Sequence, residues 1–90
     1  NSDSKNKTVA INLAQEKLED VKNQALAGAL TDDTTTENNV NDLGVAGSGI
    51  YNRTTVITGG GTGSLATITV TVDWTDNVPR SVALTTKINQ

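Results

Sequence analysis

The chain has no cysteine, histidine, methionine or phenylalanine, and it contains one proline, one tryptophan and one tyrosine. Without cysteine and histidine it cannot form a disulfide bond, a Cys/His zinc site or a c-type haem attachment. A Cys–His pair and a Ser–His–Asp triad are excluded for the same reason. The net charge of −3 has the wrong sign for binding nucleic-acid phosphates. We therefore expect no enzymatic activity, no cofactor, no bound metal and no nucleic-acid partner.

The residues that are present suit one small domain spanning 1–90. Threonine, asparagine and glycine are frequent, which is compatible with a bacterial exported or cell-surface protein. No window approaches the roughly 20 apolar residues of a membrane span. Because the chain starts at Asn1 rather than at methionine, we interpret it as processed or truncated.

Residues 1–28 are predicted to form an amphipathic helix. Ser2 can cap its start, and Asp3 suits the helix dipole and lies four residues before Lys7. Gly28 can cap its end. Apolar residues recur at spacings of three and four, and this stripe consists of Ala10, Ala14, Leu18, Val21 and Ala25, with Ile11 at its border.

Val9 and Leu13 are predicted on a flank turned away from the centre of this stripe, beside Glu16 and Asp20. Single apolar residues on a surface are normal, so this flank can be ordinary surface. The alternative is a second contact strip for another helix or subunit.

Residues 29–48 are predicted to be a variable polar loop, since 31–48 show no period and are rich in turn formers. A connection of this length is either functional or held in place by Val40, Leu43 and Val45.

Residues 49–90 are predicted to form an antiparallel sheet. Strands are expected at 49–58, 65–74 and 80–88, with turns at 59–64 and 75–79. Residues 65–74 alternate between apolar and polar residues, so one face of the sheet is apolar and the amphipathic helix must cover it. The expected fold is α+β, with one N-terminal helix packed on a three- to four-stranded antiparallel meander. The expected helix–sheet core consists of Leu18, Val21, Ala25, Ile68, Val70, Val72, Trp74, Val82 and Leu84.

Three patterns resemble functional motifs but fit them poorly. Residues 61–66 match the dinucleotide pattern G-x-G-x-x-[GA], yet a strand follows where the phosphate-binding helix must begin, so a hairpin turn is expected. Residues 39–44 resemble the start of a calcium loop, but Leu43 occupies a ligand position, which favours a solvated loop. Trp74 is expected in the core rather than as a ligand platform.

Two segments resemble a known family. Residues 6–19, NKTVAINLAQEKLE, are similar to the segment that follows the hydrophobic stem in minor type IV pilins of the PilV kind and in type II secretion pseudopilins. Residues 68–75, ITVTVDWT, and 82–86, VALTT, are similar to the closing strands of that family. The resemblance covers roughly half of the chain.

The resemblance implies a pilin fold and a structural subunit of a type IV pilus or pseudopilus. The family's cleaved leader and long apolar stem are missing here. Either the stem was removed, or this chain is the globular half of a split pilin whose apolar helix is a separate short chain; the start at Asn1 favours the second. The partners would be other pilin subunits, and contact with the membrane would come only through the missing or partner helix. The expected partner-helix interface is Val9, Ala10, Ile11, Leu13 and Ala14.

A second function stays open. The chain can be a binding module at a filament tip or surface, with the 31–48 loop and the 59–64 hairpin as its ligand face.

Overall fold

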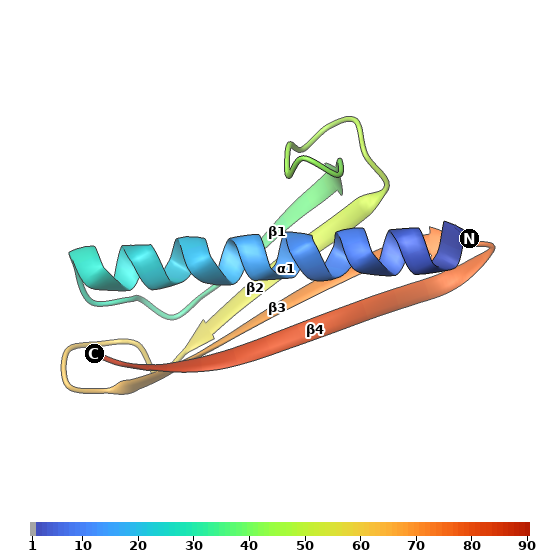
Figure 1. The fold of residues 1–90 in the computed structure, drawn as a ribbon. Helices are drawn as coiled ribbons and strands as arrows, with labels where there is room; N and C mark the ends of the chain where they lie inside the picture. Colours follow the sequence, from blue (N-terminus) through green and yellow to red (C-terminus); the bar gives the residue numbers. More distant parts are fainter. Residues whose placement is uncertain (1) are drawn as a thin grey trace.

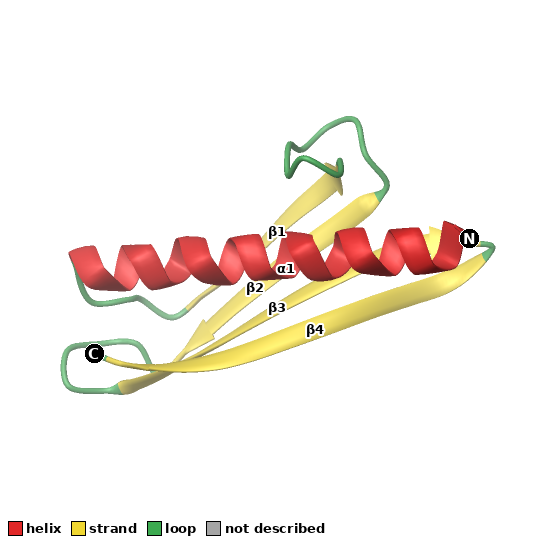
Figure 2. Ribbon diagram, in the orientation of Figure 1, coloured by secondary structure: helices red, strands yellow, loops and turns green. Residues whose placement is uncertain are grey.

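A long helix lies across one face of a four-stranded antiparallel sheet (Figure 1). The computed structural model describes residues 2–90, with side chains from residue 4 onward. The elements follow in the order α1 (Ser2–Ala27), β1 (Asp33–Val40), β2 (Tyr51–Thr58), β3 (Leu65–Asp76) and β4 (Val78–Asn89). The strands are neighbours in chain order, so the sheet is a meander, and the helix and sheet form two layers (Figure 2). The predicted α+β fold is confirmed, with four strands.

The helix α1 packs on β2, β3 and β4 through small residues. Ala10 and Ala14 are fully buried, and two alanines on one face let the helix backbone approach the sheet closely. Leu18 and Ala25 are partly buried and pack at the margin of the core. The capping by Ser2 and the pairing of Asp3 lie outside the described side chains.

The end of α1 differs in detail from the prediction. The helix ends at Ala27, and the N–H of Gly28 donates to the carbonyl of Gln24 at 3.2 Å. Gly28 does not have the positive φ of a left-handed glycine cap, in contrast to five other glycines of the chain. The helix therefore ends one residue before its glycine without the expected cap geometry.

The predicted position of Leu13 on an outward flank is wrong. Leu13 is 1% exposed and is among the largest fully buried side chains. The buried arc of α1 is centred on Ala10 and Ala14, and Leu13 and Leu18 lie on opposite sides of that centre. The Leu13 side is covered, whereas Leu18 is only partly buried. The arc is therefore displaced toward Leu13 relative to the stripe read from the sequence.

The predicted loop at 29–48 contains a strand, which is a second correction. Residues 33–40 form β1, which pairs with β2 from Asp33 opposite Ile57 to Val40 opposite Tyr51. The register shifts between Glu37 and Val40, where Asn39 has a φ of 54°. Nearly all of β1 is exposed because α1 does not cover it, so its residues show no alternation. Only the flanking residues 29–32 and 41–50 are connections.

The strand β3 forms the centre of the core, as its alternation predicted. The side chains that face α1 are all buried, namely Ala66, Ile68, Val70, Val72 and Trp74. The Trp74 ring lies 5.8 Å from the Tyr51 ring, centroid to centroid, at an interplanar angle of 58°. Trp74 is thus a core residue, as predicted. Val82 and Leu84 of β4 are only partly buried because β4 is an edge strand.

The turn between β3 and β4 is tighter than the predicted 75–79. Pairing continues to Thr75 opposite Pro79 and Asp76 opposite Val78, which leaves Asn77 at the tip with a φ of 64°. Asparagine tolerates this left-handed conformation better than most residues. The hairpin therefore extends β3 to Asp76 and starts β4 at Val78.

Candidate partner-binding surface

Three large apolar side chains are exposed on the connection between β1 and β2. Leu43 is 78% exposed, Val45 is 58% exposed and Ile50 is 54% exposed. We name Leu43, Val45 and Ile50 the loop patch. Single exposed apolar residues need no explanation, but three within residues 41–50 make this connection a candidate contact surface.

Asn41 holds this loop in one conformation. Its side-chain Oδ1 accepts hydrogen bonds from the backbone N–H groups of Leu43 at 2.9 Å and Val45 at 3.0 Å. Its own N–H donates to the carbonyl of Val45 at 2.9 Å. An asparagine that bonds the backbone ahead of it in this way stabilises a tight turn. The loop patch is therefore presented by an ordered segment, which lowers the entropy lost when a partner binds.

At two glycines, the loop between β1 and β2 lies so close to its neighbours that a side chain would not fit. A Cβ atom on Gly44 would collide with the carboxylate of Glu16, and one on Gly49 would collide with the backbone of Val40. Gly44 also has a φ of 85°, which favours glycine. Gly44 therefore lets the loop lie close to the helix, and Gly49 lets it lie close to the end of β1.

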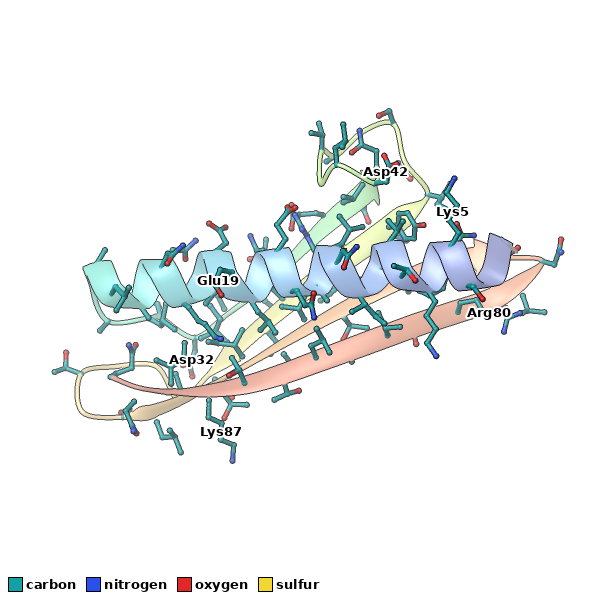
Figure 3. All side chains as sticks on the ribbon, viewed as in Figure 1. Lys5, Glu19, Asp32, Asp42, Arg80 and Lys87 are labelled. Carbon is teal, nitrogen blue, oxygen red and sulfur yellow. The ribbon has the colours of Figure 1, made fainter. Side chains whose placement is uncertain are left out.

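A groove of about 250 Å³ separates the loop from the N-terminal part of α1. Val9, Ile50 and Tyr51 contribute its apolar walls, and Lys5 and Asp42 lie on its two sides (Figure 3). The Tyr51 hydroxyl donates to Asn6 Oδ1 at 3.2 Å across the base of this region. Burial raises the pKa of Tyr51, and the charges of Asp42 and Asp76 add to this effect. The tyrosine therefore stays neutral and acts as a hydrogen-bond donor.

The five residues predicted to contact a partner helix fall into two groups. Ala10, Leu13 and Ala14 are buried in the helix–sheet core and cannot contact another chain in this fold. Val9 and Ile11 are partly exposed, and Val9 lines the groove beside the loop patch. The predicted partner-helix interface did not include Leu43, Val45 and Ile50, although the 31–48 loop was named as part of the alternative ligand face.

A buried arginine joins the helix to the sheet below this surface. Arg53 of β2 is 4% exposed, and its Nε and Nη2 atoms each lie 2.9 Å from a carboxylate oxygen of Glu37. Its Nη1 donates to the carbonyl of Leu13 at 3.1 Å and to Glu16 Oε1 at 3.3 Å. Lys17 Nζ approaches Glu37 Oε1 at 3.8 Å. One guanidinium thus contacts α1 and β1 together.

The ion pair shifts the pKa of Glu37 and the pKa of Arg53, each in the direction that favours the charged form. The hydrogen bond from Arg53 lowers the pKa of Glu37, although partial burial opposes the shift, and the charges of Arg53 and Lys17 lower it further. The same hydrogen bond raises the pKa of Arg53. Sequence reasoning missed this network because Arg53 and Glu37 are 16 residues apart and lie on strands whose pairing was not predicted.

The glycine turn at residues 59–64 uses its backbone groups within the chain. The N–H of Gly60 donates to Asp32 Oδ1 at 2.7 Å, and the N–H of Gly63 donates to the carbonyl of Gln90. Strand β3 follows the turn, so the expected hairpin is confirmed and no helix N-terminus faces these glycines. The loops before and after β2 lie at opposite ends of that strand (Figure 1), so the 41–50 loop and this turn do not form one ligand face.

In the segment that resembles a calcium loop, residues 39–44, the side-chain oxygen of Asn41 accepts hydrogen bonds from the backbone of its own loop. Among the described residues, no three acidic side chains gather as a possible metal site. Over its described length, α1 lacks the apolar run needed to cross a membrane.

Comparison with known proteins identified no relative of this chain. No family model, curated protein or solved structure matches the chain.

Proposed function

We propose that this chain is a structural subunit of a type IV pilus or secretion pseudopilus, exported to the periplasm and the cell surface. Two observations support the proposal. Residues 6–19 resemble the segment after the stem in minor pilins, and the fold places a long N-terminal helix across a four-stranded antiparallel meander. In this role the chain works by burying apolar helical surface in an assembly, and it performs no chemistry.

The observation that carries the proposal furthest is the position of the loop patch. Leu43, Val45 and Ile50 are exposed on an ordered loop, and the groove between that loop and α1 is lined by Val9 and Ile50. In the pilin family the apolar stem precedes this end of the helix. A stem helix of a neighbouring subunit that packs alongside the first half of α1 would find these apolar side chains beside it.

An apolar helix is the occupant that suits this surface. Helices bind grooves through side chains at i, i+3, i+4 and i+7, which present a narrow apolar stripe. The groove of about 250 Å³ beside Val9 takes one large side chain of such a stripe, and the loop patch covers its flank. The partner helix can be the stem of a neighbouring subunit or a separate short pilin chain.

The test is mass spectrometry of filaments sheared from the producing cells and washed free of soluble protein. We expect to find this chain in the filament. Equal amounts of a chain beginning at Asn1 and of a short apolar chain would establish the two-chain form. A peptide that runs from an apolar stem into residue 1 would overturn the two-chain form and retain the pilin assignment. Absence of the chain from all filaments would overturn the proposed function.

A binding module at a filament tip is the second candidate, and the ordered loop at 41–50 is the feature that favours it. The 59–64 turn lies at the other end of the sheet, so the ligand face would have to be the loop patch and its groove alone. Stoichiometry separates the two functions. A tip module is rare in the filament and binds its ligand as a monomer, whereas a structural subunit is present along the filament.

A further inference from the structure

The two edges of the sheet differ in how they are protected against pairing with another strand. Natural sheets block their edges with charges, bulges, prolines or short strands. The edge strand β1 has the charged residues Asp33 and Glu37, and its register is interrupted before Val40. The edge strand β4 pairs with β3 in an unbroken register over its whole length. It carries Pro79 and Arg80 near its start and Lys87 near its end, but its middle, residues 81–86, contains no charge and no proline.

The core is also open on the β4 side. Val82, Leu84 and Ile88 of β4 are only partly buried. On α1 the residues Ile11, Leu18 and Ala25 recur every seven positions and so lie along one side of the helix. Arg53 and its partners lie on the side of α1 that carries Leu13. The side that carries Ile11, Leu18 and Ala25 therefore faces β4.

A cavity at this edge supports the same conclusion. About 270 Å³ of space lies between the start of α1 and the start of β4, with Lys7, Trp74, Ser81 and Val82 among its walls. On the opposite side of the helix–sheet interface, the buried Arg53 guanidinium joins α1 to β1. The uncharged, proline-free middle of the β4 edge and the partly buried apolar residues of the core therefore lie on the same side of the molecule.

We propose that β4 pairs with β4 of a second copy of this chain, antiparallel and around a twofold axis at Thr85. This register places Val82 opposite Ile88 and Leu84 opposite Thr86, so the apolar face continues across the junction. Lys87 lies opposite Ala83, and no like charges meet. Backbone groups at the β4 edge gain partners, which is the main source of affinity in strand addition.

The spacing of the two helices fits this arrangement. The helix α1 lies over β3 and β4, and neighbouring strands are about 4.8 Å apart. Each helix axis therefore lies about one strand spacing from the twofold axis, which places the two helices about 10 Å apart. Packed helices are separated by about 8–10 Å, so the Ile11 and Leu18 sides of the two helices can contact each other above the joined sheet. A second copy thus covers both the edge and the open side of the core.

The test is sedimentation equilibrium of the whole chain at concentrations up to the order of 1 mM, with variants at Thr85. Thr85 is exposed, and its Oγ1 lies 3.1 Å from Oγ1 of Thr69 on the neighbouring strand. In the proposed dimer the two Thr85 residues are opposite each other. Thr85→Lys and Thr85→Glu should each weaken dimerisation roughly tenfold because like charges then meet. An equal mixture of the two variants should restore it.

The matched control is Thr36→Lys on the other edge. Thr36 is also exposed on an edge strand, and its Oγ1 lies 3.3 Å from Oγ1 of Thr54 on the neighbouring strand. This variant should leave dimerisation unchanged, and thermal unfolding of all variants will show that each is folded. A chain that stays monomeric throughout the range would overturn the proposal. So would equal weakening by Thr36→Lys, or a mixture that fails to dimerise. The measurement does not depend on whether the chain is a pilus subunit.

Discussion

Arg53 and Glu37 form a two-point ion pair across β1 and β2, with both N–O distances at 2.9 Å. The guanidinium is buried, and it also binds the carbonyl of Leu13 on α1 at 3.1 Å. Strand β1 contributes one buried apolar residue, Val40. The attachment of β1 to the rest of the domain therefore depends on this ion pair and on backbone pairing, rather than on a shared apolar face.

Glu37→Gln should destabilise the domain by about 2 kcal/mol, because it removes the carboxylate that compensates a buried guanidinium. Glu16→Gln is the matched control, since Glu16 contacts the same Arg53 at 3.3 Å but is exposed, and it should change stability by no more than about 0.5 kcal/mol. Urea unfolding of the two variants measures the difference. Equal losses of stability in the two variants would mean that Glu37 stabilises the domain no more than the exposed Glu16 does.

The difference between the native chain and Glu37→Gln should depend on pH. The hydrogen bond from Arg53 holds the pKa of Glu37 below its ordinary value of 4.5 in the folded state. Unfolding restores the ordinary pKa, so the stabilisation is complete above about pH 4.5 and is lost as the pH falls through the folded-state pKa. Urea unfolding at a series of pH values should show a constant gap near neutrality and a shrinking gap in acid. A gap that widens in acid would contradict this assignment.

The sequence predicted those parts of the fold in which the local pattern of apolar and polar side chains determines the structure. The alternation of residues 65–74 identified β3 because one face of that strand is buried and the other is polar. Strand β1, DTTTENNV, has no such contrast, since it is exposed on both faces apart from Glu37 and Val40. Its formation depends on pairing with β2 and on Arg53, both of which are distant in the sequence.

The error at Leu13 and the omission of Leu43, Val45 and Ile50 from the predicted partner-helix interface have related causes. The spacing of apolar residues gave the width of the buried arc on α1 but not which neighbour covers each side, and β2 covers the Leu13 side through Arg53. For residues 41–50, composition predicted a polar loop. The exposure of Leu43 and Val45 follows from the hydrogen bonds of Asn41, which no periodicity indicates.

Leu13→Ala should destabilise the domain by about 3 kcal/mol, because it leaves a cavity in the core where Leu13 is 1% exposed. Leu26→Ala provides the control on the same helix. Leu26 is 87% exposed, so its truncation should be close to neutral, within about 0.5 kcal/mol. Thermal unfolding followed by circular dichroism compares the two. A small loss for Leu13→Ala would place it outside the core.

Gly60→Ala should destabilise the domain by about 2 kcal/mol, because the added Cβ would collide with the backbone carbonyl of Leu30 and force the turn away from it. Gly28→Ala should do the opposite. Gly28 has open space around it and no positive φ, so alanine there should stabilise by about 0.5 kcal/mol through a less flexible unfolded chain. Urea midpoints that shift in opposite directions for the two variants would agree with the crowding at Gly60 and the open space at Gly28. A stabilising Gly60→Ala would contradict the close approach of Gly60 to the carbonyl of Leu30.

Leu43→Asp and Val45→Asp should reduce incorporation into filaments while leaving the isolated domain as stable as before. Both side chains are mostly exposed and contribute little to the core, so folding does not need them. If they contact an apolar partner helix, a buried carboxylate there is unfavourable unless it is paired.

Leu65→Asp is the matched control, because Leu65 is 52% exposed at the start of β3, at the other end of β2 from the loop patch. Quantitative immunoblots of sheared filaments, normalised to total cellular protein, measure incorporation. We expect a severalfold loss for the two loop variants and no loss for Leu65→Asp. Normal incorporation of both loop variants would remove the loop patch from the assembly interface, and an equal loss for all three would indicate a general effect of added negative charge.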